Sequence, residues 1–148
     1  MTNLVKEPIV LLNLQAKEED QAFDEMIASL HAAGAIKSVK AFKRAIIKRE
    51  KLSSTGFGEG VAIPHAKHRT VKHPMIVFAR SKDGVNYNSH DGKPVHLLFM
   101  LAMPLKTNDV HLEVLSQLAR RLMHASFKEQ LLIAETEEAV KELLKETY

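Results

Sequence analysis

The sequence predicts an α/β fold, with a single domain in which a mixed parallel and antiparallel sheet is covered by helices. Short apolar runs typical of strands alternate with segments whose apolar residues recur at helical spacing. Neither an internal repeat nor an obvious linker interrupts this alternation, so residues 1–148 are expected to form one domain. The Asp83-Gly84 dipeptide follows a strand-like run and predicts a hairpin or tight turn, which makes the sheet partly antiparallel.

The first part of the chain predicts a strand followed by a helix. Residues 9–14 form the predicted strand, which the chain enters through Pro8. The register changes at Lys17, where a helix with acidic residues in its first turn is expected to begin and to continue as far as Gly34. Its buried face is predicted from residues three or four apart: Phe23, Met26, Ile27 and Leu30.

A second helix is expected after Ser38, whose hydroxyl can act as the N-cap. One side of this helix is apolar, at Val39, Phe42 and Ile46. Lysines and arginines occupy the opposite side, as in an amphipathic helix on a protein surface. The helix should end near residues 50–52, which places Arg49 just before a segment rich in glycine.

Residues 55–67 form the segment where we expect the chemistry. Glycines stand at every second position of its first part: Gly56, Gly58 and Gly60. Glycine permits positive φ and a close approach to the main chain, so Thr55 and these glycines predict a loop shaped around a bound group. A short strand at residues 61–63 should end at Pro64, which cannot donate to a sheet, and His65 follows at its carboxyl end.

The next part of the chain predicts two more strands. A polar connection, residues 67–73, leads to a strand at residues 75–79 and then to the turn at residues 82–84. A second turn at residues 90–92 precedes the run of residues 95–103. Because this run is apolar on both faces, we expect it to lie in the middle of the sheet.

Three helices are predicted in the C-terminal part. Candidate caps for the first are Thr107, Asn108 and Asp109. Its inward stripe has offsets of three, four, seven and eleven: His111, Val114, Leu115, Leu118 and Leu122. Ser126 with Glu129 forms a capping-box pattern for a shorter helix, and Thr136 should begin the last one, which ends near residue 146.

Composition limits the possible functions. Hydrophobic residues make up 45% of the 148 residues, which suffices for a core. The longest apolar runs, residues 9–12 and 97–103, are far shorter than the roughly 20 residues that cross a bilayer, so no direct membrane insertion and a cytoplasmic location are expected. Without cysteine the chain has no disulfides or thiolate metal sites. The net charge of +3 is spread along the chain, which argues against nucleic acid as a partner.

The segment Gly-Glu-Gly-Val-Ala-Ile-Pro-His-Ala-Lys, residues 58–67, resembles the active-site signature of a known family. That family comprises the enzyme IIA domains of the fructose and mannitol class (type 2) of the bacterial phosphoenolpyruvate-dependent sugar phosphotransferase system. Three further segments, residues 48–56, 87–99 and 111–119, are similar to family segments in the same order. Residues 87–95 and 111–119 are closest to fructose-type members. The resemblance therefore covers most of the chain and implies an enzyme IIA domain across residues 1–148.

The resemblance implies a relay of phosphate between proteins. His65 would accept a phosphoryl group from the phosphocarrier protein HPr and pass it to a cysteine of an enzyme IIB domain. The IIB domain and its membrane enzyme IIC would be on separate chains. The sugar would be fructose or a related one, and the chain would be a phosphotransferase with a phosphohistidine intermediate.

The residues can support such a step. Imidazole titrates near pH ~6.5 when unperturbed, so much of His65 is a neutral nucleophile at neutral pH, with no need for a metal or cofactor. The groups expected around the phosphate are Arg49, His111 and the amides of the loop at Thr55, Gly56, Gly58 and Gly60. His111 would contribute from the first turn of its helix, where unpaired amides face an anion. The resemblance also implies that His111 lies close to His65 and that Arg49 lies nearby.

Two other functions remain open. A regulatory module related to nitrogen metabolism, from another branch of the same family, would use phosphohistidine as a signal instead of passing it on. A metal-dependent hydrolase is the third possibility, because the chain has eight histidines. However, it contains no His-Glu-x-x-His helix, and His65 and His68 lack the further ligand pattern of a zinc site, so we expect no metal.

Overall fold

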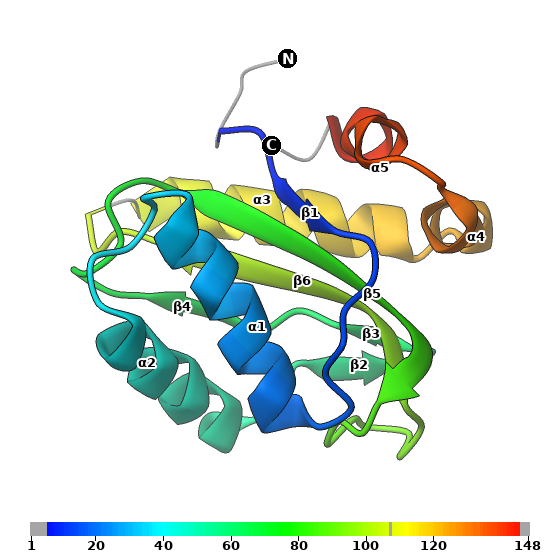
Figure 1. Cartoon of the computed structure of the whole chain (residues 1–148), viewed down its shortest axis with the longest axis horizontal. Helices are drawn as coiled ribbons and strands as arrows, with labels where there is room; N and C mark the ends of the chain where they lie inside the picture. The colour runs from blue at the N-terminus through cyan, green and yellow to red at the C-terminus, as the bar shows by residue number, and fades with distance from the viewer. Residues whose placement is uncertain (1–5, 107, 146–148) are drawn as a thin grey trace.

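The computed structural model describes residues 6–106 and 108–145, and it shows a sheet with helices on both faces (Figure 1). Within those ranges the sheet has six strands, in the order β1-β5-β6-β3-β2, and β4 pairs with β6 as well. The strands are β1 Ile9–Leu11, β2 Gly56–Gly58, β3 Val61–Ala62, β4 His65–Lys67, β5 Met75–Val85 and β6 Val95–Met103. The β5–β6 and β2–β3 pairs are antiparallel and the other pairs are parallel, which confirms the predicted mixed sheet.

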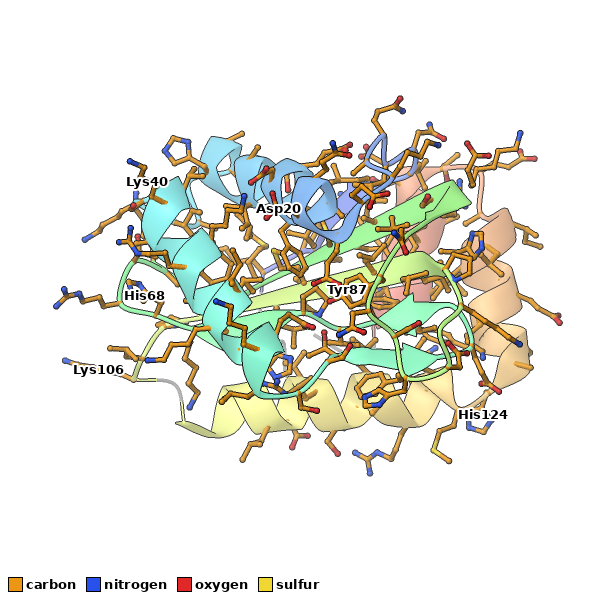
Figure 2. All side chains as sticks on the ribbon, turned by 90° about the horizontal axis from the view of Figure 1, so that it is seen from below. Asp20, Lys40, His68, Tyr87, Lys106 and His124 are labelled. Carbon is orange, nitrogen blue, oxygen red and sulfur yellow. The ribbon has the colours of Figure 1, made fainter. Side chains whose placement is uncertain are left out.

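The helices form two layers (Figure 2). One layer contains α1 (Glu19–Ala32) and α2 (Val39–Leu52), and the other contains α3 (Asn108–Leu122), α4 (Ala125–Ile133) and α5 (Glu137–Leu144). Two apolar cores result, one between each helical layer and the sheet. In the part of the chain that the structure describes, no helix has the length and apolar character that a bilayer span requires.

Strand β6 lies in the middle of the sheet, as its sequence predicts. Its side chains alternate between the two cores. Those facing α1 and α2 are Leu98, Met100 and Ala102, and those facing α3, α4 and α5 are Leu97, Phe99, Leu101 and Met103. An apolar run with no polar alternation is therefore the pattern of a strand that is buried on both faces.

The features predicted for the first two helices, a buried apolar stripe in α1 and a Ser38 cap on α2, are confirmed. The apolar stripe of α1 is buried, and the chain leaves this helix through Gly34 at a φ of +74°. The hydroxyl of Ser38 accepts a hydrogen bond of 3.1 Å from the backbone N–H of Ala41, so Ser38 is the N-cap of α2.

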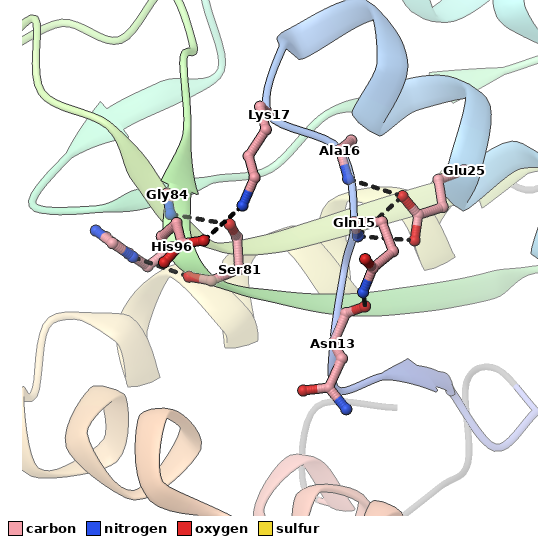
Figure 3. A network of polar contacts seen from close by, with 9 residues as sticks. Asn13, Gln15, Ala16, Lys17, Glu25, Ser81, Gly84 and His96 are labelled. Atoms are coloured by element: carbon pink, nitrogen blue, oxygen red, sulfur yellow. Dashed lines mark hydrogen bonds and ion pairs between the residues drawn. The ribbon is translucent and has the colours of Figure 1, made fainter.

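The predicted turn at Asp83-Gly84 is wrong, because these residues lie inside β5. The pairing register changes between Arg80, opposite Leu97, and Val85, opposite Val95, so four residues of β5 oppose one of β6 in a bulge. Gly84 adopts a φ of +94° and donates its N–H to the Ser81 hydroxyl at 3.0 Å (Figure 3). The Asp-Gly pair thus supplies the bulge, and the chain reverses over residues 86–94.

Predictions at four other element ends have mixed outcomes. Strand β1 ends at Leu11, three residues earlier than expected. Ser126 lies inside α4, whose N-cap is His124, so the capping box predicted there is wrong. The hydroxyl of Thr136 accepts from Ala139 N–H at 3.1 Å and caps α5 as predicted. Of the candidate caps of α3, Thr107 and the side chains of Asn108 and Asp109 lie outside what the structure describes.

Arg80 ties β5 to the end of α4 and to the segment after β1. Its guanidinium donates to the carbonyls of Leu131, Leu132 and Ala134 at 2.6–3.2 Å, and to that of Leu12 at 3.3 Å. A cation at the C-terminus of a helix also interacts favourably with the helix dipole. Sequence reasoning assigned no role to this arginine.

Gly56 packs tightly against the β5–β6 connection. A Cβ at this position would lie 2.8 Å from the Cα of Ser89 and 3.0 Å from the ring of Tyr87. We therefore expect Gly56→Ala to lower the free energy of unfolding by about 1–3 kcal/mol in urea titrations. Ser126→Ala is the control, because Ser126 is exposed inside a helix and should tolerate alanine. Equal stability of the Gly56 variant and the wild type would contradict this packing.

Candidate active site

His65 is the first residue of β4 and pairs with Leu101 of β6. The parallel register continues across Pro64, because Val61 opposite Leu97 and His65 opposite Leu101 have the same offset. Pro64 cannot donate, but its carbonyl accepts from the N–H of Leu101 at 3.0 Å and keeps the two chains together. As predicted, β3 ends before Pro64, at Ala62, but a further strand that was not predicted, β4, begins at His65 in the same register.

The imidazole of His65 is held by the backbone between β3 and β4. Its Nδ1 lies 2.7 Å from the carbonyl oxygen of Ile63. A carbonyl can only accept, so Nδ1 carries the hydrogen, and the neutral ring has its lone pair on Nε2. The backbone therefore selects the tautomer whose nucleophilic atom is Nε2.

The pKa of His65 lies below the ordinary value for histidine. Burial is the largest cause, because it disfavours the charged imidazolium, and the positive charge of Arg49 acts in the same direction. The bond to Ile63 and the negative charge of Glu50 oppose this shift. The ring is consequently neutral at neutral pH.

His65 and Arg49 line the same pocket, which has a volume of about 640 Å³. It lies between α2 and β4, and its wall carries several cationic side chains: Arg44, Lys48, Arg49 and Lys67. Ala41, Ala45 and Ala66 make part of it apolar. A positive pocket beside a neutral nucleophile suits an anionic group such as a phosphoryl group.

Arg49 is positioned by the end of its own helix. Its Nη1 donates to the carbonyl of Ser53 at 2.9 Å, one turn further along the chain. A guanidinium has five N–H donors, so this bond leaves it capacity to bind oxygens of an anion in the pocket. Its effect on the pKa of His65 shows that the two side chains interact electrostatically.

Thr55 is buried and is hydrogen-bonded to Glu50 and to Ile63. Its hydroxyl donates to the carboxylate of Glu50, and its N–H donates to the same carboxylate at 3.1 Å. Its carbonyl accepts from the N–H of Ile63 at 3.0 Å. Thr55 therefore contacts the short segment that holds the His65 ring.

The structure does not bring Gly58 and Gly60 to the pocket of His65. Gly56 and Gly58 belong to β2, and Gly60, with a φ of +81°, follows in the turn to β3. Since Val61 opposes Leu97 and His65 opposes Leu101, the turn lies about four residues, or roughly 13 Å, from the histidine along the strand. A role of these glycines in binding phosphate stays a prediction.

His111 lies in the first turn of α3, and its side chain is outside what the structure describes. Its predicted position beside His65 stays a prediction. The apolar residues of the same stripe do face the core, since Val114 and Leu118 are fully buried. Within the described ranges, no three His, Asp or Glu side chains gather as ligands for a metal ion.

Sequence reasoning missed Glu50 and left Lys67 undecided. Lys67 lies two residues after His65, so the period of a strand puts both on one face of β4. Continuing the strand past Pro64 would have revealed this. In the sequence, Glu50 next to Arg49 has the pattern of a solvated ion pair. Only its hydrogen bonds with Thr55, which the structure shows, give Glu50 a different role.

A pH titration tests the environment of His65. Because its pKa is lowered, the midpoint followed by NMR on the folded protein should lie below the value of about 6.5 expected for the same histidine in urea. Phosphoryl acceptance should accordingly fall only at a more acidic pH than an unperturbed imidazole would require, where the lone pair of His65 is protonated. A midpoint above that of the unfolded chain would contradict the half-buried, neutral ring.

Comparison with known proteins identifies relatives of this chain. Residues 3–147 match the family model described as "Phosphoenolpyruvate-dependent sugar phosphotransferase system, EIIA 2". The fructose-specific EIIABC component of Bacillus subtilis is 46% identical over 144 residues, which are 97% of this chain and 23% of that protein. The chain thus spans about a quarter of that relative's length. The fructose-specific EIIA component of Haloferax volcanii is 36% identical over 141 residues, 94% of this chain and 92% of that protein.

A solved structure has the same fold. It is the nitrogen regulatory protein IIA-Ntr of Neisseria meningitidis, with a TM-score of 0.85 and 36% identity. The match covers 91% of this chain and 92% of that one. The chain is therefore similar both to relatives named as fructose-specific components and to a protein named as a nitrogen regulatory protein.

Proposed function

The chain belongs to the EIIA type 2 family of the phosphoenolpyruvate-dependent sugar phosphotransferase system, and from that premise we propose that His65 is its phosphoryl-carrying residue. Members of the family are phosphotransferases with a phosphohistidine intermediate. The observation that carries the assignment is the 2.7 Å contact between His65 Nδ1 and the Ile63 carbonyl, which puts the lone pair on Nε2. Arg49 and the cationic pocket beside the ring supply the charge that a phosphoryl group requires.

The proposed chemistry is two successive in-line transfers. The lone pair of Nε2 attacks the phosphorus of phospho-HPr while the bond from phosphorus to the donor breaks. In the second step a cysteine thiolate of an enzyme IIB domain attacks the same phosphorus, and the bond to Nε2 breaks, which regenerates the neutral ring. Family members pass the group to EIIB domains, and the IIB domain would in turn serve a membrane enzyme IIC.

The strength of phosphate binding must be modest in a carrier. Each ~1.4 kcal/mol of extra stabilisation of phosphohistidine shifts the transfer equilibrium tenfold toward the carrier. Arg49 is the arginine expected to contact the phosphate, while Lys48 and Lys67 lie on more flexible stems around the pocket. Such an arrangement favours transient binding over trapping of the phosphoryl group.

Fructose or a closely related sugar is the proposed final acceptor of the phosphoryl group that this chain relays. Two of the relatives above carry the name fructose-specific, and one of them is similar over nearly its whole length. The sugar itself would be recognised by the membrane enzyme IIC, so this chain would determine only which IIB domain receives the phosphate.

A regulatory role is the second candidate. It is favoured by the likeness to the nitrogen regulatory protein IIA-Ntr, which extends over 91% of this chain. In this case phosphohistidine would be the signal and would not be passed to a sugar-specific IIB domain.

A chase experiment separates the two roles. The protein would be labelled with phospho-HPr carrying radioactive phosphate, and a fructose-type IIB domain would then be added. Loss of the label to the IIB domain within the assay supports sugar uptake. Label that stays on this chain supports the regulatory role, provided that the same IIB domain accepts phosphate from its own EIIA.

A further inference from the structure

We propose that Glu50 is a positioning residue of the phosphoryl-transfer site, which acts on His65 through Thr55 and Ile63. This inference rests on the proposed function of His65 and adds to it a residue that the sequence pattern does not identify. Glu50 lies in the last turn of α2, directly after Arg49. Its carboxylate faces the β2–β3 hairpin instead of forming an ion pair among those described.

The first link joins Glu50 to Thr55. One carboxylate oxygen accepts the N–H of Thr55 at 3.1 Å and the other accepts its hydroxyl. Two bonds from one carboxylate to one residue fix both the backbone and the side chain of that residue. Thr55 is only 2% exposed, so water does not compete freely for these bonds.

Tyr87 completes the buried network. Its hydroxyl lies 3.0 Å from the Thr55 hydroxyl. Because Thr55 gives its hydrogen to the carboxylate, which can only accept, Tyr87 must be the donor in this contact. Burial raises the pKa of the Tyr87 phenol, so the phenol keeps the hydrogen that this contact needs.

The second and third links lead from Thr55 to the reacting ring. The carbonyl of Thr55 accepts the N–H of Ile63 at 3.0 Å, and the carbonyl of Ile63 contacts His65 Nδ1 at 2.7 Å. Thr55 comes directly before β2 and Ile63 directly after β3, so both carbonyls flank the short β2–β3 hairpin. A hairpin of this length has little rigidity of its own. The position of the Ile63 carbonyl, and with it the tautomer of His65, therefore depends on how firmly α2 holds Thr55.

Two substitutions separate positioning from charge. Glu50→Ala removes both bonds to Thr55. Glu50→Gln removes the charge but keeps the contacts, because its amide oxygen can accept from the Thr55 N–H and its amide group can donate to the Thr55 hydroxyl. The matched control is Glu25→Ala, since Glu25 likewise accepts backbone N–H groups, those of Gln15 and Ala16 at 3.0–3.1 Å, but in the segment before α1 (Figure 3).

The first readout is the tautomer of His65, taken from the ¹⁵N shifts of its ring in the unphosphorylated protein at pH ~8, where an unperturbed imidazole is neutral. We expect the hydrogen to be on Nδ1 in the wild type, in Glu50→Gln and in Glu25→Ala. In Glu50→Ala we expect a mixture of both tautomers. The resonances are assigned with His65→Ala, and far-UV circular dichroism verifies that each variant is folded.

The second readout is the rate of phosphorylation by phosphoramidate, a small donor that requires no protein docking. Glu50→Ala should lower kcat by about 10-fold to about 100-fold with little change in KM, since a displaced nucleophile affects the transfer and not the binding of the donor. Glu50→Gln should keep most of the wild-type kcat.

The outcomes are decisive in both directions. A Glu50→Ala protein with the wild-type tautomer and kcat would overturn the proposal, and so would a Glu50→Gln protein as impaired as the alanine variant, because the charge alone would then matter. If Glu50→Ala does not fold, Thr55→Val replaces it. Valine loses the hydroxyl bond but keeps the N–H bond to Glu50, so a mixture with a smaller share of the second tautomer is expected. The tautomer is measured without any donor, so a failure of His65 to accept phosphate, which would refute the proposed function, leaves this comparison intact.

Discussion

Replacing His65 with glutamine should abolish labelling by phospho-HPr, with a loss of at least about 10³-fold in initial rate. Removal of a nucleophile leaves only the contribution of the surrounding groups, and a glutamine amide has no lone pair that can form the covalent intermediate. Glutamine keeps the polarity and approximate size of the side chain, so the sheet should stay intact. The measurement is incorporation of radioactive phosphate into the isolated chain.

The control for this variant is His73→Gln. His73 lies on the connection after β4 and does not line the pocket of His65. Its replacement should change the labelling rate by less than about threefold, as expected for a position outside the site. Persistent labelling of the His65 variant, or loss of labelling in the His73 variant, would show that another histidine carries the phosphate.

Arg49→Met is expected to reduce the rate of phosphoryl acceptance by about 10²-fold, because it removes a positive charge beside the developing phosphate charge while keeping an unbranched, largely apolar stem. It should also raise the pKa of His65, since the charge of Arg49 holds that pKa down. The pH below which activity falls should therefore move upward. Kinetics and an NMR titration of the same variant measure the two effects together.

Arg69→Met is a suitable comparison for Arg49→Met. Arg69 is exposed, follows β4 and is not part of the pocket wall. Arg69→Met lowers the net charge by the same amount as Arg49→Met. Any general loss of attraction between this chain and phospho-HPr therefore appears in both variants. If both variants lose the same activity, Arg49 acts through long-range charge and not at the phosphate.

Much of the fold follows from local chemistry. The Ser38 and Thr136 caps, the stripe of α1 and the central position of β6 are each determined by neighbouring residues or by a period along one segment. The bulge at Gly84 is different, because an Asp-Gly pair is compatible with a turn or a bulge, and the choice depends on the pairing of β5 with β6. Continued pairing past Pro64 likewise depends on the neighbouring strand.

The candidate site was predictable to a similar extent. His65 and Arg49 stand in a recognisable segment and share a pocket in the structure. Glu50 was not predictable, because its role depends on contacts that run from a helix through a hairpin to a third segment. The alternating glycines have a local explanation that sequence spacing does not reveal, since Gly56 makes room for Ser89 and Gly60 forms a turn.

The central claim is that the phosphoryl group is carried on Nε2 of His65. It is tested most directly by NMR of the ¹⁵N-labelled protein after phosphorylation by phospho-HPr, in which the coupling between phosphorus and nitrogen identifies the bonded atom. The account predicts one phosphorylated residue, His65, with phosphorus bonded to Nε2 and hydrogen retained on Nδ1. Phosphorus bonded to Nδ1 of His65, or to any other residue, would contradict it.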